Sequence, residues 1–104
     1  MARLIWTEPA LEDLNAIAET IALDNPEAAR RLVGDVLSAT ERLESYPHSG
    51  KRVRELDRSP YRELVVSPCR IFYRPEQRAV FILHVLRGEQ LFRKFLLMER
   101  DRKK

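Results

Sequence analysis

The sequence of 104 residues predicts an α+β fold in which an antiparallel helical hairpin packs on an antiparallel sheet meander. In the first half of the chain, apolar residues recur at three- and four-residue spacing, which is the period of an amphipathic helix. In the second half, β-branched and aromatic residues gather in short runs that are separated by proline-containing turns. Because a chain of this length fits one compact domain, we expect residues 1–104 to form a single domain.

The chain is expected to begin with a short strand that leads into the first helix. Arg3–Trp6 is that strand, and Thr7 is a natural N-cap residue. Pro9 is tolerated in a first helical turn because the N–H groups of that turn have no partner within the helix. The apolar stripe of this helix consists of Leu11, Leu14, Ile17, Ala18, Ile21 and Ala22.

A second helix is expected after a very short turn. Asn25 suits its N-cap and Pro26 its first position, while Pro47 and Gly50 end it. Its apolar stripe consists of Ala29, Leu32, Val33, Val36, Leu37, Thr40 and Leu43. Two helices joined by so short a turn form an antiparallel hairpin.

The second half is expected to form the sheet and a final helix. The predicted strands are Val53–Leu56, Tyr61–Val66, Cys69–Arg74 and Val80–Leu86. Short turns at residues 67–68 and 75–77 make the last three of these strands an antiparallel meander. The final helix, Arg93–Lys104, carries six basic and two acidic residues.

The apolar faces of the hairpin and the sheet are expected to pack together as the core. The helices contribute Leu14, Ile17, Ile21, Leu32, Val36, Leu37 and Leu43. The sheet contributes Val65, Ile71, Phe72, Ile82 and Leu83.

Composition excludes several classes of function. The single cysteine, Cys69, rules out an intramolecular disulfide, and with only His48 and His84 it cannot build a cysteine-based zinc site. Three glycines are too few for a Gly-rich phosphate loop, and no other cofactor motif is present, so we expect neither metal nor cofactor. No apolar run is long enough for a signal peptide or a membrane helix, which predicts a cytoplasmic protein without membrane contact.

Charge is divided unevenly along the chain. Residues 8–45 carry nine acidic and three basic residues, a net charge of −6, whereas residues 46–104 carry fifteen basic and seven acidic residues, a net charge of +8. A basic half of this size can attract nucleic acid or an acidic protein segment. It is equally compatible with an ordinary solvated surface.

Basic and aromatic side chains on the predicted strands are the candidates for chemistry: Arg62, Arg70, Tyr73, Arg74, His84 and Arg87. Arginines interleaved with aromatic rings suit contacts to phosphates and bases, but they also suit a plain surface whose arginine stems lie over apolar neighbours. His84 could act as a general acid or base, or it could be a half-buried side chain of an apolar strand. Cys69 is expected to be a packed thiol rather than a reactive one.

The order of elements resembles the RelE/ParE superfamily of toxins, and four segments carry the resemblance. The segment Trp6–Ala10, with Asp13-Leu14, is similar to the N-terminal segment of that family. Residues 24–29 are similar to the turn between its two helices, and residues 47–56 are similar to the segment that enters its sheet. The longest match is Tyr61–Arg74, with the sequence YRELVVSPCRIFYR. The resemblance implies the toxic component of a type II toxin–antitoxin system.

The resemblance implies one of two activities, since ParE-like members act on DNA gyrase and RelE-like members cut messenger RNA on the ribosome. Arg70 matches a basic residue that both branches carry, and Arg62 stands where RNA-cutting members often have a lysine. Many relatives carry His-Gly and then Arg-Asp after the last strand, but this chain has Arg87-Gly88 and Gln90-Leu91. RNA-cutting members also often carry a tyrosine near the C-terminus, and the last helix here contains none.

These departures favour the ParE-like branch. RNA cleavage by 2′-hydroxyl attack needs a base, charge stabilisation and a leaving-group acid. An arginine stays protonated and is a poor proton shuttle, so His84 would have to transfer protons alone. The first hypothesis is therefore an inhibitor of DNA gyrase without chemistry of its own. The alternatives are a RelE-like ribosome-dependent endoribonuclease and a non-toxic module that only binds an antitoxin.

Three sets of site residues follow from these hypotheses. The residues expected to contact the target are Arg70, Tyr73, Arg87, Gln90, Arg93 and Lys94. The catalytic set of a ribonuclease would be Arg62, Arg70, His84 and Arg87. The resemblance also implies a cognate DNA-binding antitoxin whose C-terminal segment folds on the toxin, and we expect Trp6, Leu11 and Leu14 to contact it.

Overall fold

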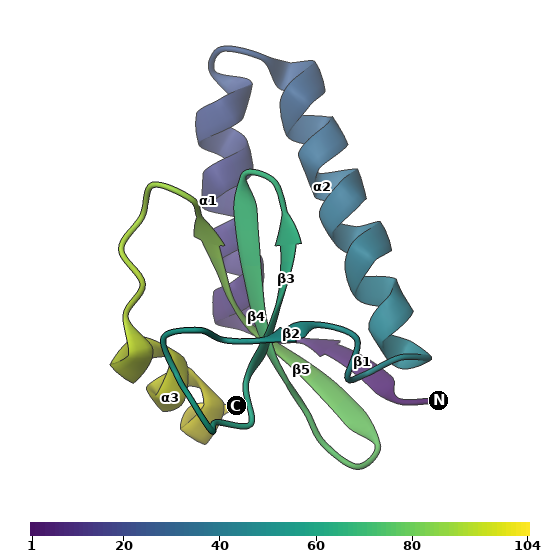
Figure 1. The fold of residues 1–104 in the computed structure, drawn as a ribbon. Coiled ribbons are helices and arrows are strands. Elements are labelled where there is room, and N and C mark those ends of the chain that lie inside the picture. Colours follow the sequence, from purple (N-terminus) through teal and green to yellow (C-terminus); the bar gives the residue numbers. More distant parts are fainter.

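One five-stranded sheet organises the molecule, and the helical hairpin covers one of its faces (Figure 1). The computed structural model describes residues 1–104. The strand order in the sheet is β1-β5-β4-β3-β2. The elements are β1 Arg3–Trp6, α1 Glu8–Ala22, α2 Pro26–Glu41, the short 3₁₀ helix η1 Arg42–Glu44, β2 Lys51–Arg52, β3 Arg62–Val66, β4 Cys69–Pro75, β5 Ala79–Arg87 and α3 Lys94–Lys103. The predicted α+β fold is confirmed.

The hairpin of α1 and α2 forms as the sequence predicts. The Asn25 side chain caps α2, since its Oδ1 accepts a hydrogen bond of 3.1 Å from the Ala28 N–H. Thr7 stands at the N-cap position of α1 but does not cap it with its side chain. Its hydroxyl instead donates to the Ile82 carbonyl of β5 at 2.7 Å, so Thr7 ties the start of α1 to the sheet. No helix is long and apolar enough to cross a membrane.

The sheet is mixed rather than purely antiparallel. The meander β3-β4-β5 is antiparallel as predicted, but β1 runs parallel to β5, with Arg3 opposite Ala79 and Trp6 opposite Ile82. The predicted strand Val53–Leu56 is wrong, since β2 ends at Arg52. Val53 is 1% exposed, and its carbonyl accepts the Leu56 N–H, so residues 53–56 form a turn instead of continuing the strand.

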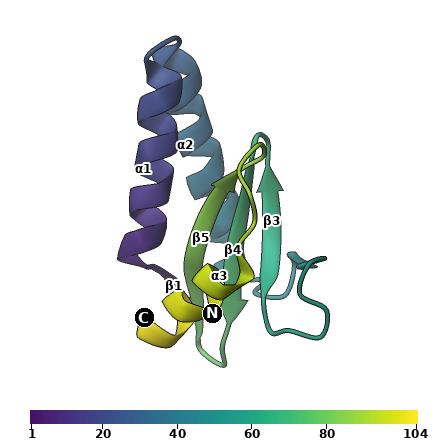
Figure 2. The ribbon, with the colours of Figure 1, turned by 90° about the vertical axis from the view of Figure 1, so that its left-hand side faces the viewer.

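Apolar side chains cover both faces of the sheet and form two clusters. The cluster under the hairpin contains Ala2, Ala10, Leu14, Ile17, Leu32, Val36, Leu43, Cys69, Ile71, Tyr73, Val80, Ile82 and Val85. The cluster on the opposite face, under α3, contains Val53, Tyr61, Phe72, Leu83, Leu86 and Leu97. Figure 2 shows the hairpin on one side of the sheet and α3 near the lower end of β5. Phe72 and Leu83 are therefore core residues, as predicted. They lie on the face opposite the hairpin, because successive residues of a strand point to opposite faces of the sheet.

Two predicted core residues are exposed instead. Leu37 is 41% exposed because it lies off the stripe that α2 buries, in which Val36 and Thr40 have no exposed surface. Val65 is 59% exposed because it faces away from the hairpin on β3, while α3 packs on β5. Ile21 is partly buried against the hairpin cluster, and the other predicted core residues are buried.

Candidate functional site: a cavity at the end of β5

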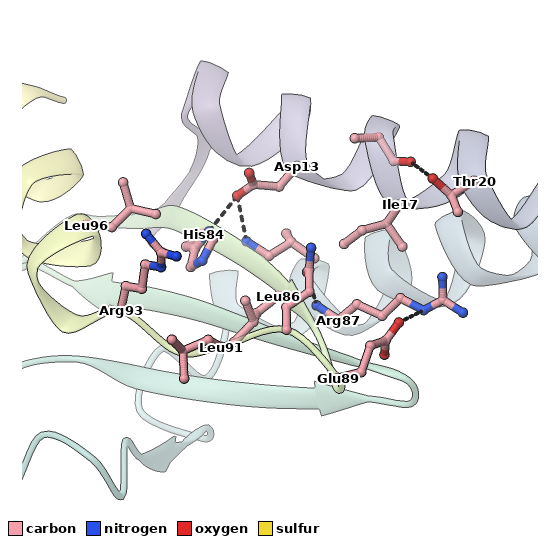
Figure 3. A pocket seen from close by; sticks show the side chains of 13 residues that line it. Asp13, Ile17, Thr20, His84, Leu86, Arg87, Glu89, Leu91, Arg93 and Leu96 are labelled. Carbon is pink, nitrogen blue, oxygen red and sulfur yellow. Dashed lines mark hydrogen bonds and ion pairs between the residues drawn. The ribbon is translucent and has the colours of Figure 1, made fainter.

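A cavity of about 550 Å³ lies where α1, the end of β5 and the segment leading into α3 meet (Figure 3). Four residues that the sequence singled out line it together: His84, Arg87, Gln90 and Arg93. Ile17, Leu86, Leu91 and Leu96 give part of the wall an apolar character. The cavity is thus the place where the largest number of the predicted site residues converge.

The cavity exists because β1 covers only the first half of β5. Pairing between the two strands stops at Trp6 and Ile82, and the chain then turns into α1. A register shift opposite Phe72 and Tyr73 leaves Leu83 as an extra residue of β5. Because β1 ends at this point, the edge of β5 that faces away from β4 has no strand partner beyond Ile82.

Side chains satisfy three backbone groups on this open edge. The Leu83 carbonyl accepts from Arg100 Nη1 at 3.0 Å, and the Val85 N–H donates to Asp13 Oδ2 at 3.0 Å. The Arg87 N–H donates to Gln90 Oε1 at 2.7 Å. These bonds replace the strand partner that β5 lacks.

Asp13 is the centre of a charged cluster at one end of the cavity. Its Oδ2 lies 2.6 Å from His84 Nδ1, and Arg100 donates to both of its oxygens, at 2.5 and 3.1 Å. Burial acts to raise the pKa of Asp13, but hydrogen bonds from His84, Arg100 and the Val85 N–H outweigh it and hold that pKa below its ordinary value. The carboxylate is therefore the charged partner that holds α1, β5 and α3 together.

His84 is mostly buried, and one of its two ring nitrogens is hydrogen-bonded. The residue is 6% exposed, and its ring is stacked on Phe72 with the centroids 5.8 Å apart. Its Nδ1 is taken by Asp13, with Arg100 Nη1 only 2.9 Å away. His84 is thus a mostly buried side chain of an apolar strand with its Nδ1 hydrogen-bonded, and its role in proton transfer stays a prediction.

Arg70 is held within the fold on the face of the sheet that α3 covers. It makes two hydrogen bonds to the Glu55 carboxylate, at 3.0 and 2.8 Å, and its Nη2 lies 2.6 Å from Glu63 Oε2. The Glu55 hydrogen bonds, together with Glu63, raise the pKa of Arg70, and Arg70 in turn lowers the pKa of Glu55. Its guanidinium also lies over the Phe72 ring, 4.8 Å from the centroid. Arg70 is thus already paired before any target binds.

The expected catalytic set is divided between the two faces of the sheet. Arg62 stands opposite Tyr73 and Arg87 opposite Cys69, on the face under the hairpin, whereas Arg70 and His84 lie on the other face. Arg87 Nε lies 2.8 Å from Glu89 Oε1, at the rim of the cavity. The structure therefore does not bring Arg62, Arg70, His84 and Arg87 to one site.

Tyr73 is placed in the core rather than on a contact surface. It has no exposed surface, and its hydroxyl accepts a hydrogen bond of 2.8 Å from the Gly50 N–H. Burial raises the pKa of the Tyr73 hydroxyl. The expectation that Tyr73 contacts a target is corrected on this ground, because its side chain cannot reach the surface in this fold.

The residues expected to contact an antitoxin differ in accessibility. Leu11 is 46% exposed on α1, and Trp6 is partly buried against the hairpin cluster. Leu14 is 4% exposed and belongs to the core, so it cannot offer a free surface. Further apolar surface lies around α3, where Leu91, Phe95 and Met98 are exposed.

Sequence reasoning missed Asp13 and Arg100 as site residues. Asp13 belonged to a recognised family segment, and as a polar residue beside Leu14 it stood next to the buried stripe of α1. Arg100 was one of six basic residues in the last helix, and nothing in the sequence separated it from the other five. Only the fold shows that these two residues, 87 positions apart, form an ion pair.

Cys69 has no exposed surface, which confirms the prediction of a packed thiol. Burial raises the pKa of this thiol and so disfavours the reactive thiolate. No group of three or more His, Cys, Asp or Glu side chains is arranged to hold a metal ion.

A family model for the ParE toxin of the type II toxin-antitoxin system parDE matches residues 4–92. The chain belongs to the ParE toxin family. As a ParE-family protein, it is the toxin component of a type II toxin–antitoxin system, and family membership implies a cognate antitoxin as its partner.

Individual relatives of this ParE-family toxin agree with the family match. The toxin RelE2 of Caulobacter vibrioides is 40% identical over 68 residues, which cover 65% of this chain and 73% of the relative. The putative toxin Y4kP of Sinorhizobium fredii is 38% identical over 92 residues, covering 85% and 90% of the two chains. The solved structure described as a chromosomal ParDE TA system from P. aeruginosa is similar with a TM-score of 0.70 and 28% identity, over 86% of this chain and 98% of the other.

Proposed function

We propose that this ParE-family toxin inhibits DNA gyrase by binding and performs no chemistry of its own. The observation that carries the proposal is the state of His84. It is the only histidine of the sheet, and its Nδ1 faces a carboxylate that already binds Arg100. The Nε2 atom has no hydrogen-bond partner, but only 6% of the residue is exposed and its ring is stacked on Phe72, so a substrate hydroxyl would have little access to that nitrogen.

Apart from Asp13 and Glu89, which are paired with arginines, the remaining cavity residues suit binding rather than acid–base catalysis. Arginine side chains stabilise negative charge but are poor proton shuttles, and Arg87 and Arg93 are the two arginines that line the cavity. Gln90 and the exposed Leu91 stand between these two arginines in the sequence. We assign the gyrase contact to this surface, with Arg87, Gln90, Arg93 and Lys94 as its polar residues.

Arg70 is not part of this proposed contact. Its guanidinium is paired with Glu55 and Glu63, so a target would have to displace two carboxylates to reach it. We assign it the structural role of joining the loop after β2 to the sheet.

The alternative is a ribosome-dependent ribonuclease, and one specific observation favours it. A relative that is 40% identical carries the name RelE2, and the superfamily branch of that name is the RNA-cutting one. In this alternative, Arg87 and Arg93 would stabilise the phosphate, and His84, with its Nδ1 held by Asp13, would have to transfer protons through Nε2.

Induction of the chain in cells that lack its antitoxin separates these functions. The proposal predicts DNA breaks, an SOS response and intact messenger RNA. Cleaved transcripts with intact DNA would instead establish the ribonuclease. A normal growth rate without either lesion would identify a non-toxic antitoxin-binding module.

Paired variants locate the contact in the same experiment. Arg93→Ala removes a charge at the cavity and should relieve growth inhibition. Arg30→Ala removes an exposed charge on α2, outside the cavity, and should leave the inhibition intact. Equal toxicity of the two variants would show that the cavity surface does not contact the target.

A further inference from the structure

A second cleft, at the β2 and β3 end of the sheet, is lined by cationic side chains and by no carboxylate. Its volume is about 300 Å³, and its lining includes His48, Arg52, Ser59, Tyr61 and Arg62. It shares no residue with the cavity at the end of β5. A ligand in this cleft would therefore contact other residues than those assigned to the gyrase contact.

The strand register places two arginines side by side in this cleft. Arg52 of β2 stands directly opposite Arg62 of β3, and opposed residues of antiparallel strands project from the same face. Like charges in this position are destabilising. The neighbouring pair of the same short ladder is complementary, because Lys51 stands opposite Glu63 and lies 3.5 Å from its carboxylate. Neither Arg52 nor Arg62 forms such an ion pair.

Arg62 is held in place by the backbone around the cleft. Its Nη1 donates to the Gly50 carbonyl at 2.8 Å and to the His48 carbonyl at 3.2 Å. The Gly50 N–H is itself fixed by the buried Tyr73 hydroxyl, and a side chain at Gly50 would clash with that hydroxyl at 2.5 Å. The Nε and Nη2 donors of Arg62 have no partner in the protein. A guanidinium fixed in this way is a preorganised donor for an oxyanion.

The surrounding loop adds positive charge to the cleft. Residues 51–58 contain four basic residues and two acidic ones. One of those acids, Glu55, is already bound to Arg70. The positive potential of this loop is thus only partly neutralised within the protein.

We propose that the Arg52–Arg62 cleft binds a phosphate group. Arg62 supplies the fixed hydrogen-bond donors, and Arg52 supplies a second charge whose repulsion from Arg62 is relieved when the phosphate binds. The phosphate is either part of a nucleic-acid backbone or a free phosphate ion, since both present the same oxygens to the arginines.

The variant Arg52→Gln tests the proposal without disturbing the backbone bonds of Arg62. The matched control is Arg30→Gln, which makes the same charge change on α2, outside the cleft. Thermal unfolding of both variants verifies that they fold. Each full-length protein is titrated with a short DNA duplex of arbitrary sequence at several salt concentrations, and separately with inorganic phosphate by calorimetry.

We expect Arg52→Gln to weaken binding of the probe about tenfold, because a charge-assisted contact is lost. If the phosphate belongs to nucleic acid, the slope of log affinity against log salt for the duplex should also fall by about one, and Arg30→Gln should leave it unchanged. If the phosphate is a free ion, the wild-type protein should bind inorganic phosphate in a saturable manner, and Arg52→Gln but not Arg30→Gln should show this loss of about tenfold in affinity. Equal effects of the two variants on both titrations, or no binding of either probe by the wild-type protein, would overturn the proposal.

Discussion

Asp13 is the residue that joins the first helix to the last. Its carboxylate accepts hydrogen bonds from His84, from the Val85 N–H and from Arg100, so one side chain connects α1, β5 and α3. Arg100 in turn binds the Leu83 carbonyl at 3.0 Å. Removing the carboxylate would leave the His84 ring and the Arg100 guanidinium, which are both mostly buried, without this hydrogen-bond partner.

The substitution Asp13→Asn is predicted to lower the free energy of unfolding by about 2–4 kcal/mol, because charge-assisted hydrogen bonds are lost and Arg100 is left unpaired. Chemical denaturation at neutral pH measures this loss. Glu12→Gln is the control, since Glu12 is exposed on the same helix. A loss as small as that of the control would show that the cluster does not hold α3.

The same cluster predicts a pH dependence in acid. The folded pKa of Asp13 lies below its ordinary value of 3.8, so its stabilising effect is complete above that value and is lost as the pH falls through the folded pKa. Thermal unfolding of the wild type and of Asp13→Asn should therefore keep its full difference from neutrality down to the ordinary pKa of 3.8, and the two should converge as the pH falls below it. A constant difference down to the lowest pH would contradict this assignment.

Arg70 shows how far single residues could be interpreted from the sequence. Its positive charge and its position on a strand could be predicted. Its partners were not, because Glu55 lies in a loop fifteen positions away and Glu63 on the neighbouring strand. Ion pairs of this kind depend on register and loop path, which no local sequence pattern encodes.

At the scale of elements, α2 offers a matched pair for testing which face is buried. Leu32 is 6% exposed and Leu37 is 41% exposed on the same helix. Leu32→Ala should lower the free energy of unfolding by about 2–5 kcal/mol, whereas Leu37→Ala should lower it by less than about 1 kcal/mol. Equal losses in chemical denaturation would mean that the helix is rotated from the orientation described above.

The elements were largely predictable because their periods are strong. The stripes of both helices, the Asn25 cap and the three long strands follow from local patterns. The parallel placement of β1 did not, because a short apolar strand carries no signal for the direction of its partner. The sheet also buries side chains on both faces, so β5 is a nearly continuous apolar run from which alternation could not assign the faces.

The candidate site was predictable only in part for a related reason. His84, Arg87, Gln90 and Arg93 lie close in sequence at the end of one strand, so their convergence followed from local order. The contribution of α1 to the cavity depends on the hairpin returning across the open edge of β5. That arrangement is a property of the tertiary fold and not of any segment.

On the scale of the whole molecule, the charge division predicts how an antitoxin binds. The net charge of +8 over residues 46–104 should steer an acidic segment toward the toxin, while apolar contacts such as Leu11 should set the lifetime of the complex. We expect the association rate to fall as salt is added and the dissociation rate to change little. Stopped-flow kinetics with the cognate antitoxin at low and high salt measure both rates. An association rate that ignores salt would show that this charge division does not steer the partner.

Inhibition of DNA gyrase by binding can be measured with purified components. Gyrase supercoiling of a relaxed plasmid is measured with the wild-type toxin, with Arg93→Ala and with the toxin already bound to its antitoxin. We expect the wild-type toxin to block supercoiling or to trap cleaved plasmid, and we expect Arg93→Ala and the antitoxin complex to do so much less. Full gyrase activity with excess wild-type toxin, together with messenger RNA cleavage when the same preparation is added to translating ribosomes, would contradict it.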